Sequence, residues 1–102
     1  MIHYLMVRFT EDYFTDDVYA DFQDTYAQMV WDQDGVEQVC IKAGQRIDSD
    51  NADIMVRLSL KDTDALGLYL VSDERRGLIA RHGRYMENVS VFNTEVDVCD
   101  CT

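Results

Sequence analysis

The chain begins with an apolar run that predicts a buried β-strand. Ile2–Phe9 contains no turn-forming residue, and its odd positions (from His3 onward) share one face of such a strand. The other face carries Ile2, Tyr4, Met6 and Arg8. Because both faces are largely apolar, we expect protein to cover both of them.

Apolar residues at helical spacing predict an amphipathic helix after this strand. Thr15 is suited to cap its N-terminus, and Asp16 and Asp17 complement the positive end of the helix dipole. The apolar stripe consists of Val18, Phe22, Tyr26, Met29 and Val30. We expect the helix to end between residues 31 and 34, with Gly35 as its C-terminal stop.

Two further strands and two more helical segments follow in the pattern. Strands are predicted over Val36–Ala43 and Ile54–Leu60, joined as a hairpin by a long, polar, solvated loop. Asp62 is expected to cap a second helix, and Ser72 to cap a further turn or helix carrying Leu78, Ile79, His82 and Met86. The last predicted strand is Val89–Phe92.

The resulting order, βαββαβ, predicts an α+β fold of the ferredoxin-like type with a four-stranded antiparallel sheet. Its helices can cover only one face of the sheet. Because the first strand is apolar on both faces, we expect a homodimer that buries sheet against sheet, a dimeric α/β barrel. Residues 1–95 form the predicted domain, and residues 96–102 a C-terminal tail that we expect to pack on the partner subunit.

Composition narrows the possible functions. A chain of 102 residues has room for one domain, and its 20 acidic against 9 basic residues give a formal charge of −11. Such a charge disfavours nucleic-acid and membrane-surface partners. No apolar run approaches the ~20 residues of a bilayer helix. The three cysteines are an odd number, which argues against a disulfide framework and for a cytoplasmic location.

Five segments taken in order carry a family resemblance: Ile2–Phe9, residues 35–36, Gly44, Asp62–Tyr69 and Val89–Asn93. Together they resemble the stress-responsive A/B barrel (Dabb) family over residues 2–95. The resemblance implies a dimeric α/β barrel with helices outside two facing sheets. Some relatives are cyclases or act on aromatic polyketides, and many have no assigned activity.

One position departs from the family pattern. Cyclase relatives pair the helix tyrosine, here Tyr69, with the second histidine of a His-Pro-x-His run. This chain has Ser72-Asp73-Glu74-Arg75 instead, so that Arg75 takes the place of that histidine. Because arginine stays protonated, it cannot act as a general base, and we expect this cyclase chemistry to be absent.

Three residues are candidates for chemistry in a pocket between sheet and helices. His3, where many relatives also keep a histidine, is expected on the strand face toward the helices, where it could exchange a proton beside Tyr26 or Tyr69. Arg75 could hold a carboxylate, a phosphate or an enolate. A hydrogen-bonded core histidine and surface arginines paired with aspartates are the structural alternatives. The predicted lining is Leu5, Val7, Phe22, Tyr26, Val56, Leu78, Met86, Val89 and Val91. Ordinary core packing explains that stripe as well.

No cofactor or metal is predicted. The segment Asp48–Asp53 is superficially similar to a calcium loop, but it lacks the glycine at loop position six and the glutamate at position twelve. Cys99 and Cys101 are too close in sequence to form a zinc site by themselves. The four arginines at positions 75, 76, 81 and 84 form the densest basic segment.

Three functions remain open from the sequence. The first is an enzyme or binder of a small, partly apolar molecule, anionic or aromatic, held in the pocket. The second is a stress-related structural or binding module whose dimer is its function. The third is a cofactor-free monooxygenase of similar barrel architecture.

Overall fold

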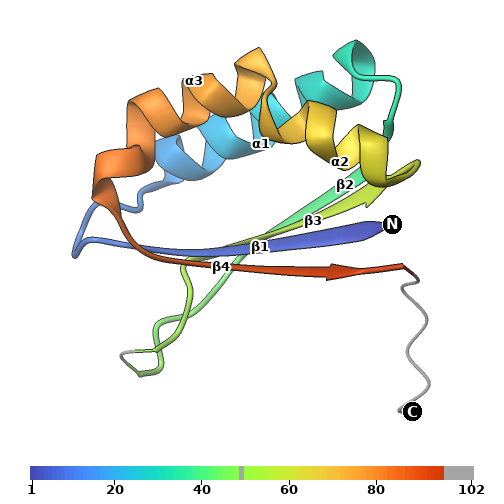
Figure 1. The fold of residues 1–102 in the computed structure, drawn as a ribbon. Coiled ribbons are helices and arrows are strands. Elements are labelled where there is room, and N and C mark those ends of the chain that lie inside the picture. Colours follow the sequence, from blue (N-terminus) through green and yellow to red (C-terminus); the bar gives the residue numbers. More distant parts are fainter. Residues whose placement is uncertain (49, 96–102) are drawn as a thin grey trace.

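The computed structural model describes residues 1–48 and 50–95, which form an antiparallel sheet with helices on one face (Figure 1). In chain order, the elements are β1 (Ile2–Phe9), α1 (Asp16–Asp32), β2 (Val36–Ala43), β3 (Ile54–Leu60), α2 (Thr63–Leu70), α3 (Asp73–His82), a 3-10 turn (Gly83–Tyr85) and β4 (Met86–Thr94). The strand order across the sheet is β2-β3-β1-β4. The ferredoxin-like α+β fold predicted from the sequence is confirmed.

The helices begin where the sequence predicts them to begin. The side chains of Thr15, Asp62 and Ser72 each accept a hydrogen bond from a backbone amide three residues further on, at 3.4, 2.8 and 3.4 Å respectively. These bonds satisfy amides in the first turn that have no partner within the helix. All three predicted N-caps are therefore confirmed.

Helix α1 ends at Asp32, within the predicted range of 31–34, but Gly35 is not its C-terminal stop. Gln33 is the C-cap, its amide donating to the Met29 carbonyl at 2.9 Å, and none of the five glycines has a positive φ. Gly35 instead permits a close approach, because a Cβ at this position would lie 2.4 Å from the Cβ of Ala65 in α2. The glycine lets α2 pack against the turn that leads into β2.

The start of β4 also differs from the prediction. The strand begins at Met86 rather than Val89, and Met86 pairs with Phe9 of β1 instead of lying on the preceding helix. The physical reason is the short 3-10 turn over residues 83–85, which interrupts the helical periodicity. Met86 follows His82 at helical spacing in the sequence but lies on a strand in space.

The hairpin loop between β2 and β3 is not wholly solvated as predicted. Asp53, at its end, is 4% exposed, and both of its carboxylate oxygens bond the Arg46 guanidinium, at 2.6 and 2.7 Å. The backbone amide of Phe9 donates to the same carboxylate at 2.8 Å. These bonds hold the pKa of Asp53 below its usual value, with the hydrogen bonds from Arg46 contributing most. The loop is thereby anchored to β1.

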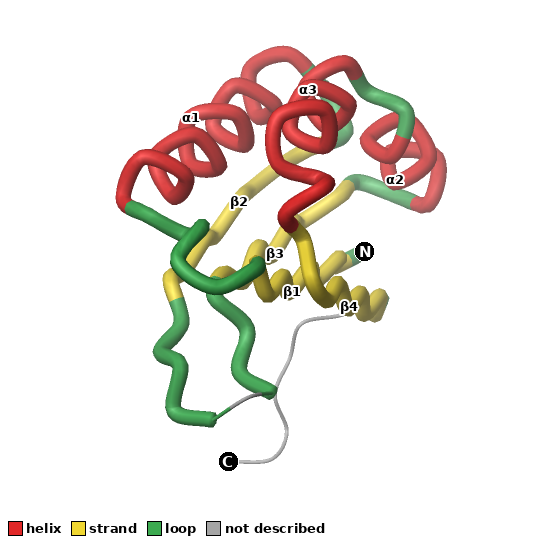
Figure 2. Tube along the Cα trace, turned by 90° about the vertical axis from the view of Figure 1, so that its left-hand side faces the viewer, coloured by secondary structure: helices red, strands yellow, loops and turns green. Residues whose placement is uncertain are grey.

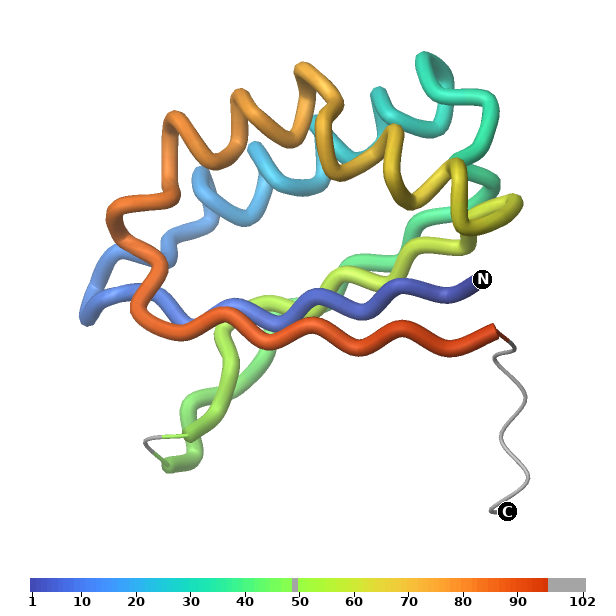
Figure 3. Tube along the Cα trace, in the orientation of Figure 1, coloured from blue at the N-terminus to red at the C-terminus, as the bar shows by residue number. Residues whose placement is uncertain are grey.

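The core lies between the helices and one face of the sheet. Figures 2 and 3 show the helices above this face, and none of the residues that the structure describes forms a helix below the other. Alternate residues of β3 point into the core, and Ile54, Val56, Leu58 and Leu60 are at most 2% exposed. On the open face the rings of Tyr4 and Phe92 lie 6.1 Å apart, and the Phe92 side chain is 58% exposed.

Candidate functional site

A cavity of about 360 Å³ lies between the sheet and the helices, a size typical of small-ligand sites. Eleven of the twelve candidate residues from the sequence line it, namely His3, Leu5, Val7, Phe22, Tyr26, Tyr69, Arg75, Leu78, Met86, Val89 and Val91. Val56 does not line the cavity, because it lies beside Leu5 on β3, one strand further from the β4 edge where the cavity lies. Leu70, Ile79 and Gly83 complete the lining and were not anticipated.

Four polar side chains gather at one end of this cavity, around Tyr69. The Tyr26 and Tyr69 hydroxyls are 2.6 Å apart, and the rings of His3 and Tyr69 are 5.5 Å apart. The Arg75 guanidinium lies 6.0 Å from the Tyr69 ring centre and donates to the Leu70 carbonyl at 3.0 Å. An imidazole, a phenol pair and a guanidinium therefore face the same space.

Burial makes both tyrosines weaker acids than a free phenol. It raises the pKa of Tyr69, an effect that the hydrogen bond with Tyr26 and the charge of Arg75 oppose. Burial, reinforced by its neighbour Tyr69, raises the pKa of Tyr26 well above its ordinary value. Both phenols are therefore protonated at neutral pH, and either hydroxyl can be the donor in the bond between them.

The other end of the cavity is apolar. His3, Leu5 and Val7 are successive inward positions of β1, opposite Asn93, Val91 and Val89 of β4. At about 3.3 Å per strand residue, the four steps from His3 to Val7 span roughly 13 Å. Beyond Val7, Met86 pairs with Phe9, and the Phe22 ring lies 5.8 Å from the Phe9 ring. The cavity is therefore polar at one end and apolar at the other.

The cavity opens to solvent between α2, α3 and the edge strand β4. Four of its apolar lining residues are 40–60% exposed: Leu70, Ile79, Val89 and Val91. An opening lined by aliphatic side chains admits a molecule with an apolar surface.

The arginine-rich segment separates into different roles. Arg75 alone of its four arginines lines the cavity, whereas Arg81 forms an ion pair with Asp21 at 2.8 Å, as the surface-pairing alternative predicts. The Arg84 guanidinium lies 5.0 Å from the centre of the Tyr85 ring.

Two sets of hydrogen-bonded side chains could not be predicted from the sequence. The Asn93 side chain bonds His3, with Oδ1 and Nδ1 2.6 Å apart across β1 and β4. Asp21, His82 and Tyr13 form a chain in which His82 Nε2 is 2.5 Å from the carboxylate and Nδ1 is 2.6 Å from the phenol. Burial opposes ionisation of Asp21, but hydrogen bonds from Arg81 and His82 lower its pKa. These partners are 60 or more residues apart, and no local pattern marks them.

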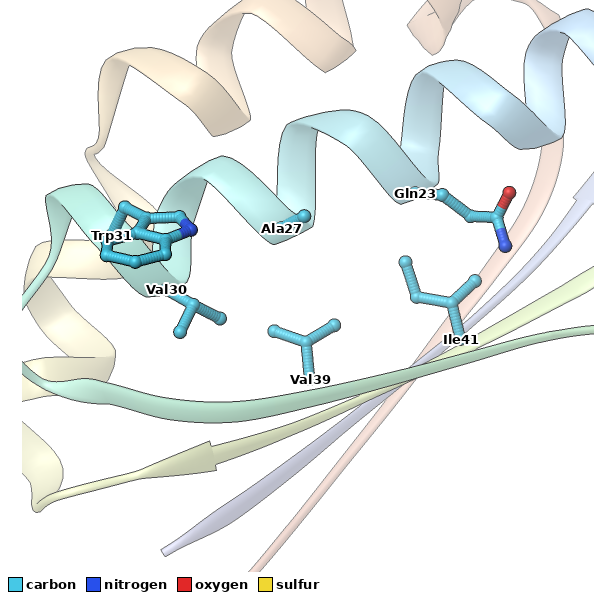
Figure 4. A pocket seen from close by; sticks show the side chains of 6 residues that line it. All are labelled: Gln23, Ala27, Val30, Trp31, Val39 and Ile41. Atoms are coloured by element: carbon cyan, nitrogen blue, oxygen red, sulfur yellow. The ribbon is translucent and has the colours of Figure 1, made fainter.

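A second hollow, of about 390 Å³, lies between α1 and the edge strand β2 (Figure 4). It is lined by Gln23, Ala27, Val30, Trp31, Val39 and Ile41, none of which is titratable at neutral pH. The Trp31 side chain is 84% exposed. This groove lacks the acid–base groups of the first cavity.

Neither a metal-ligand cluster nor a membrane-spanning helix occurs in the part of the chain that the structure describes. Residues 1–48 and 50–95 contain no group of three His, Cys, Asp or Glu side chains arranged to hold a metal ion. Within these ranges no helix is both long and apolar enough to cross a membrane. The predicted tail, with Cys99 and Cys101, lies outside the described residues.

Comparison with known proteins gives the fold and no family. No family's sequence profile matches the chain, and no curated protein sequence does. Among solved structures, a candidate antibiotic biosynthesis monooxygenase from Bacteroides thetaiotaomicron is similar with a TM-score of 0.78 and 8% identity, over 100% of this chain and 93% of that one. The hydroxynitrile lyase of Passiflora edulis follows at 0.71 and 8%, over 95% of both chains. A dimeric ferredoxin-like protein of unknown function from Thermobifida fusca gives 0.71 and 15%, over 89% and 85%.

Proposed function

We propose that the chain is a dimeric α/β barrel protein of the Dabb type that binds a small amphipathic molecule in the cavity between sheet and helices. The observation that carries the proposal is the polarity of that cavity. His3, Tyr69 and Arg75 meet at one end, and Phe22, Leu78 and Met86 surround the other. A ligand with an anionic or enolic head and an apolar body of about the length from His3 to Val7 matches this arrangement.

Arg75 is the residue that favours an anionic head. Its guanidinium donates to the Leu70 carbonyl and lies over the ring of the buried Tyr69. A charged donor in a partly desolvated cavity binds a carboxylate more strongly than a neutral donor does. Arg75 therefore acts as an anion-binding group, and His3 and Tyr69 remain as the groups that exchange protons.

A homodimer follows from the open face of the sheet. Tyr4, Met6, Met55 and Phe92 lie there without a helix above them, and Met6 and Phe92 are 39% and 58% exposed. A second copy of the same face would cover these side chains. The similar Thermobifida fusca protein is described as dimeric, which supports this assembly.

A cofactor-free monooxygenase is the second candidate. It is favoured by the similarity to the candidate monooxygenase, at a TM-score of 0.78. Oxygen dependence distinguishes this candidate from an enzyme that only transfers protons. Proton-transfer chemistry proceeds under anaerobic conditions, whereas a monooxygenase consumes one O₂ for each product formed. A non-catalytic stress-related module is the third candidate, and it requires neither turnover nor a ligand.

The binding proposal is tested by calorimetric titration with 4-butylbenzoate and its neutral analogue 4-butylbenzyl alcohol. We expect Arg75→Gln to weaken binding of the carboxylate by about 10- to 100-fold, the value of a charge-assisted hydrogen bond, and to leave the alcohol unchanged. Arg76→Gln is the matched control, because Arg76 neighbours Arg75 in α3 but does not line the cavity. Absence of saturable binding of either probe, or equal losses in both variants, would contradict the proposal.

A further inference from the structure

We infer that Asn93 is a positioning residue that fixes the tautomer of His3 and so leaves its Nε2 as the proton acceptor of the cavity. The inference deepens the proposed function. The part that concerns a bound ligand rests on that function, whereas the part that concerns the tautomer does not.

The two residues are placed by the sheet. His3 and Asn93 are directly opposite each other in the β1–β4 ladder, and both side chains are on the face that carries the helices. The imidazole is 4% exposed, and its Nδ1 lies 2.6 Å from Asn93 Oδ1. A buried ring held at this distance by a partner on a neighbouring strand has little freedom to rotate.

The chemistry of the amide decides the tautomer. Asn93 presents its Oδ1 to the ring, and an amide oxygen can only accept, so in this orientation of the amide Nδ1 carries the proton. In the neutral ring the other nitrogen is then unprotonated. Among residues 1–48 and 50–95, Nε2 of His3 has no hydrogen-bond partner, and the ring lines the cavity. Nε2 is the nitrogen left for a ligand.

The partner of His3 is a neutral amide, whereas the partner of His82 is a carboxylate. His82 Nε2 faces Asp21, and Asn93 adds no charge beside the ring of His3. The titratable groups that line the cavity with His3 are Tyr26, Tyr69 and Arg75.

The arrangement defines one balanced step for a ligand that carries an acidic C–H next to a carbonyl. Nε2 takes the proton, the C–H electron pair becomes the enolate, and the ring becomes an imidazolium whose Nδ1–H still donates to Asn93. The hydroxyl of Tyr69 and the guanidinium of Arg75 face the negative oxygen. Return of the proton to a different carbon completes an isomerisation and consumes no oxidant.

The tautomer can be measured directly on the full chain. In a protein labelled with ¹⁵N-histidine, long-range ¹H–¹⁵N correlation separates the protonated from the bare ring nitrogen, at a pH where the ring is neutral. We expect the Nδ1–H form for His3. Asn93→Leu, which removes the acceptor at similar size, is expected to shift His3 towards the Nε2–H form, whereas Asn93→Asp keeps an oxygen in place and retains Nδ1–H. The signals of His82 should not move in either variant.

The outcomes separate the two proposals. An Nε2–H form of His3 in the wild-type protein overturns the inference whether or not the variants fold. A wild-type Nδ1–H form that Asn93→Leu leaves unchanged overturns the role of Asn93. If the Nδ1–H form is found and depends on Asn93 but 4-butylbenzoate does not bind, the proposed function fails and the tautomer assignment stands.

Discussion

The hydroxyl groups of Tyr26 and Tyr69 lie 2.6 Å apart in the interior, although the two residues are 43 positions apart in the chain. One belongs to α1 and the other to α2, and neither side chain is more than 1% exposed. Each hydroxyl is therefore the partner that prevents the other from being buried unsatisfied. The same hydrogen bond therefore links α1 to α2 and forms part of the polar end of the cavity.

This relationship predicts strong coupling between the two residues. Tyr26→Phe and Tyr69→Phe should each lower the free energy of unfolding by about 1–3 kcal/mol, because each leaves the remaining hydroxyl without its hydrogen-bond partner. The double variant should lose clearly less free energy than the sum of the two, since it leaves no hydroxyl without a partner. Urea unfolding of the four proteins measures the coupling energy, and strictly additive losses would mean that the hydroxyls do not pair.

Substitution by alanine should have opposite effects on stability at two of the glycines. A Cβ at Gly35 would lie 2.4 Å from the Cβ of Ala65, so Gly35→Ala should destabilise by about 1–3 kcal/mol. Gly67 in α2 is exposed, with nothing within 4 Å of the added Cβ, so Gly67→Ala should stabilise by about 0.5–1 kcal/mol. Thermal denaturation of both variants checks the sign, and a neutral Gly35→Ala would contradict the close packing of α2.

The Arg46–Asp53 pair predicts acid sensitivity. The pKa of Asp53 is lowered in the folded state, so its stabilising effect is present above the unfolded value of about 3.9 and is lost as pH falls through the folded value. Asp53→Asn should cost about 1–3 kcal/mol at pH 7, and the loss should shrink as the pH is lowered towards 2. Asp24→Asn, at an exposed position of α1, is the control and should show no such trend. A pH-independent loss in Asp53→Asn would assign the effect to packing alone.

The open sheet face predicts the oligomeric state. Sedimentation equilibrium should give a dimer for the wild type, with an interface of order 2,000 Å². Phe92→Asp places a charge among the exposed apolar side chains of that face and should give monomers, whereas Leu68→Asp, on exposed α2, should remain dimeric. A wild-type monomer of about 12 kDa at micromolar concentration would disprove the assembly.

Much of the fold could be predicted because its determinants are local. Thr15, Asp62 and Ser72 cap helices through amides three residues away, and the period of two in Ile54–Leu60 sets which face is buried. The sequence also placed His3 on the face toward the helices. The grouping of His3, Tyr69 and Arg75 was anticipated from that strand phase together with the family resemblance, and all three line one cavity.

The rest depends on contacts that no local pattern records. Asn93 is 90 residues from His3, and Asp53 is 44 from Phe9. Asp53 occurs in a polar segment, so only the fold shows that it is buried. Met86 continues a helical spacing through a turn that ends the helix, and Gly35 is required by Ala65, which lies 30 positions further along the chain. Such features are set by tertiary packing and not by propensity.

The central claim is that the cavity holds an amphipathic anion with its head at Arg75 and its apolar end at Met86. Intermolecular NOEs between 4-butylbenzoate and the methyl-labelled protein test it most directly. The claim predicts contacts from the butyl methyl to Leu78 and Met86, and from the aromatic protons to Tyr69. Contacts to Val30 and Val39 of the groove beside Trp31, or no saturable contacts at all, would contradict it.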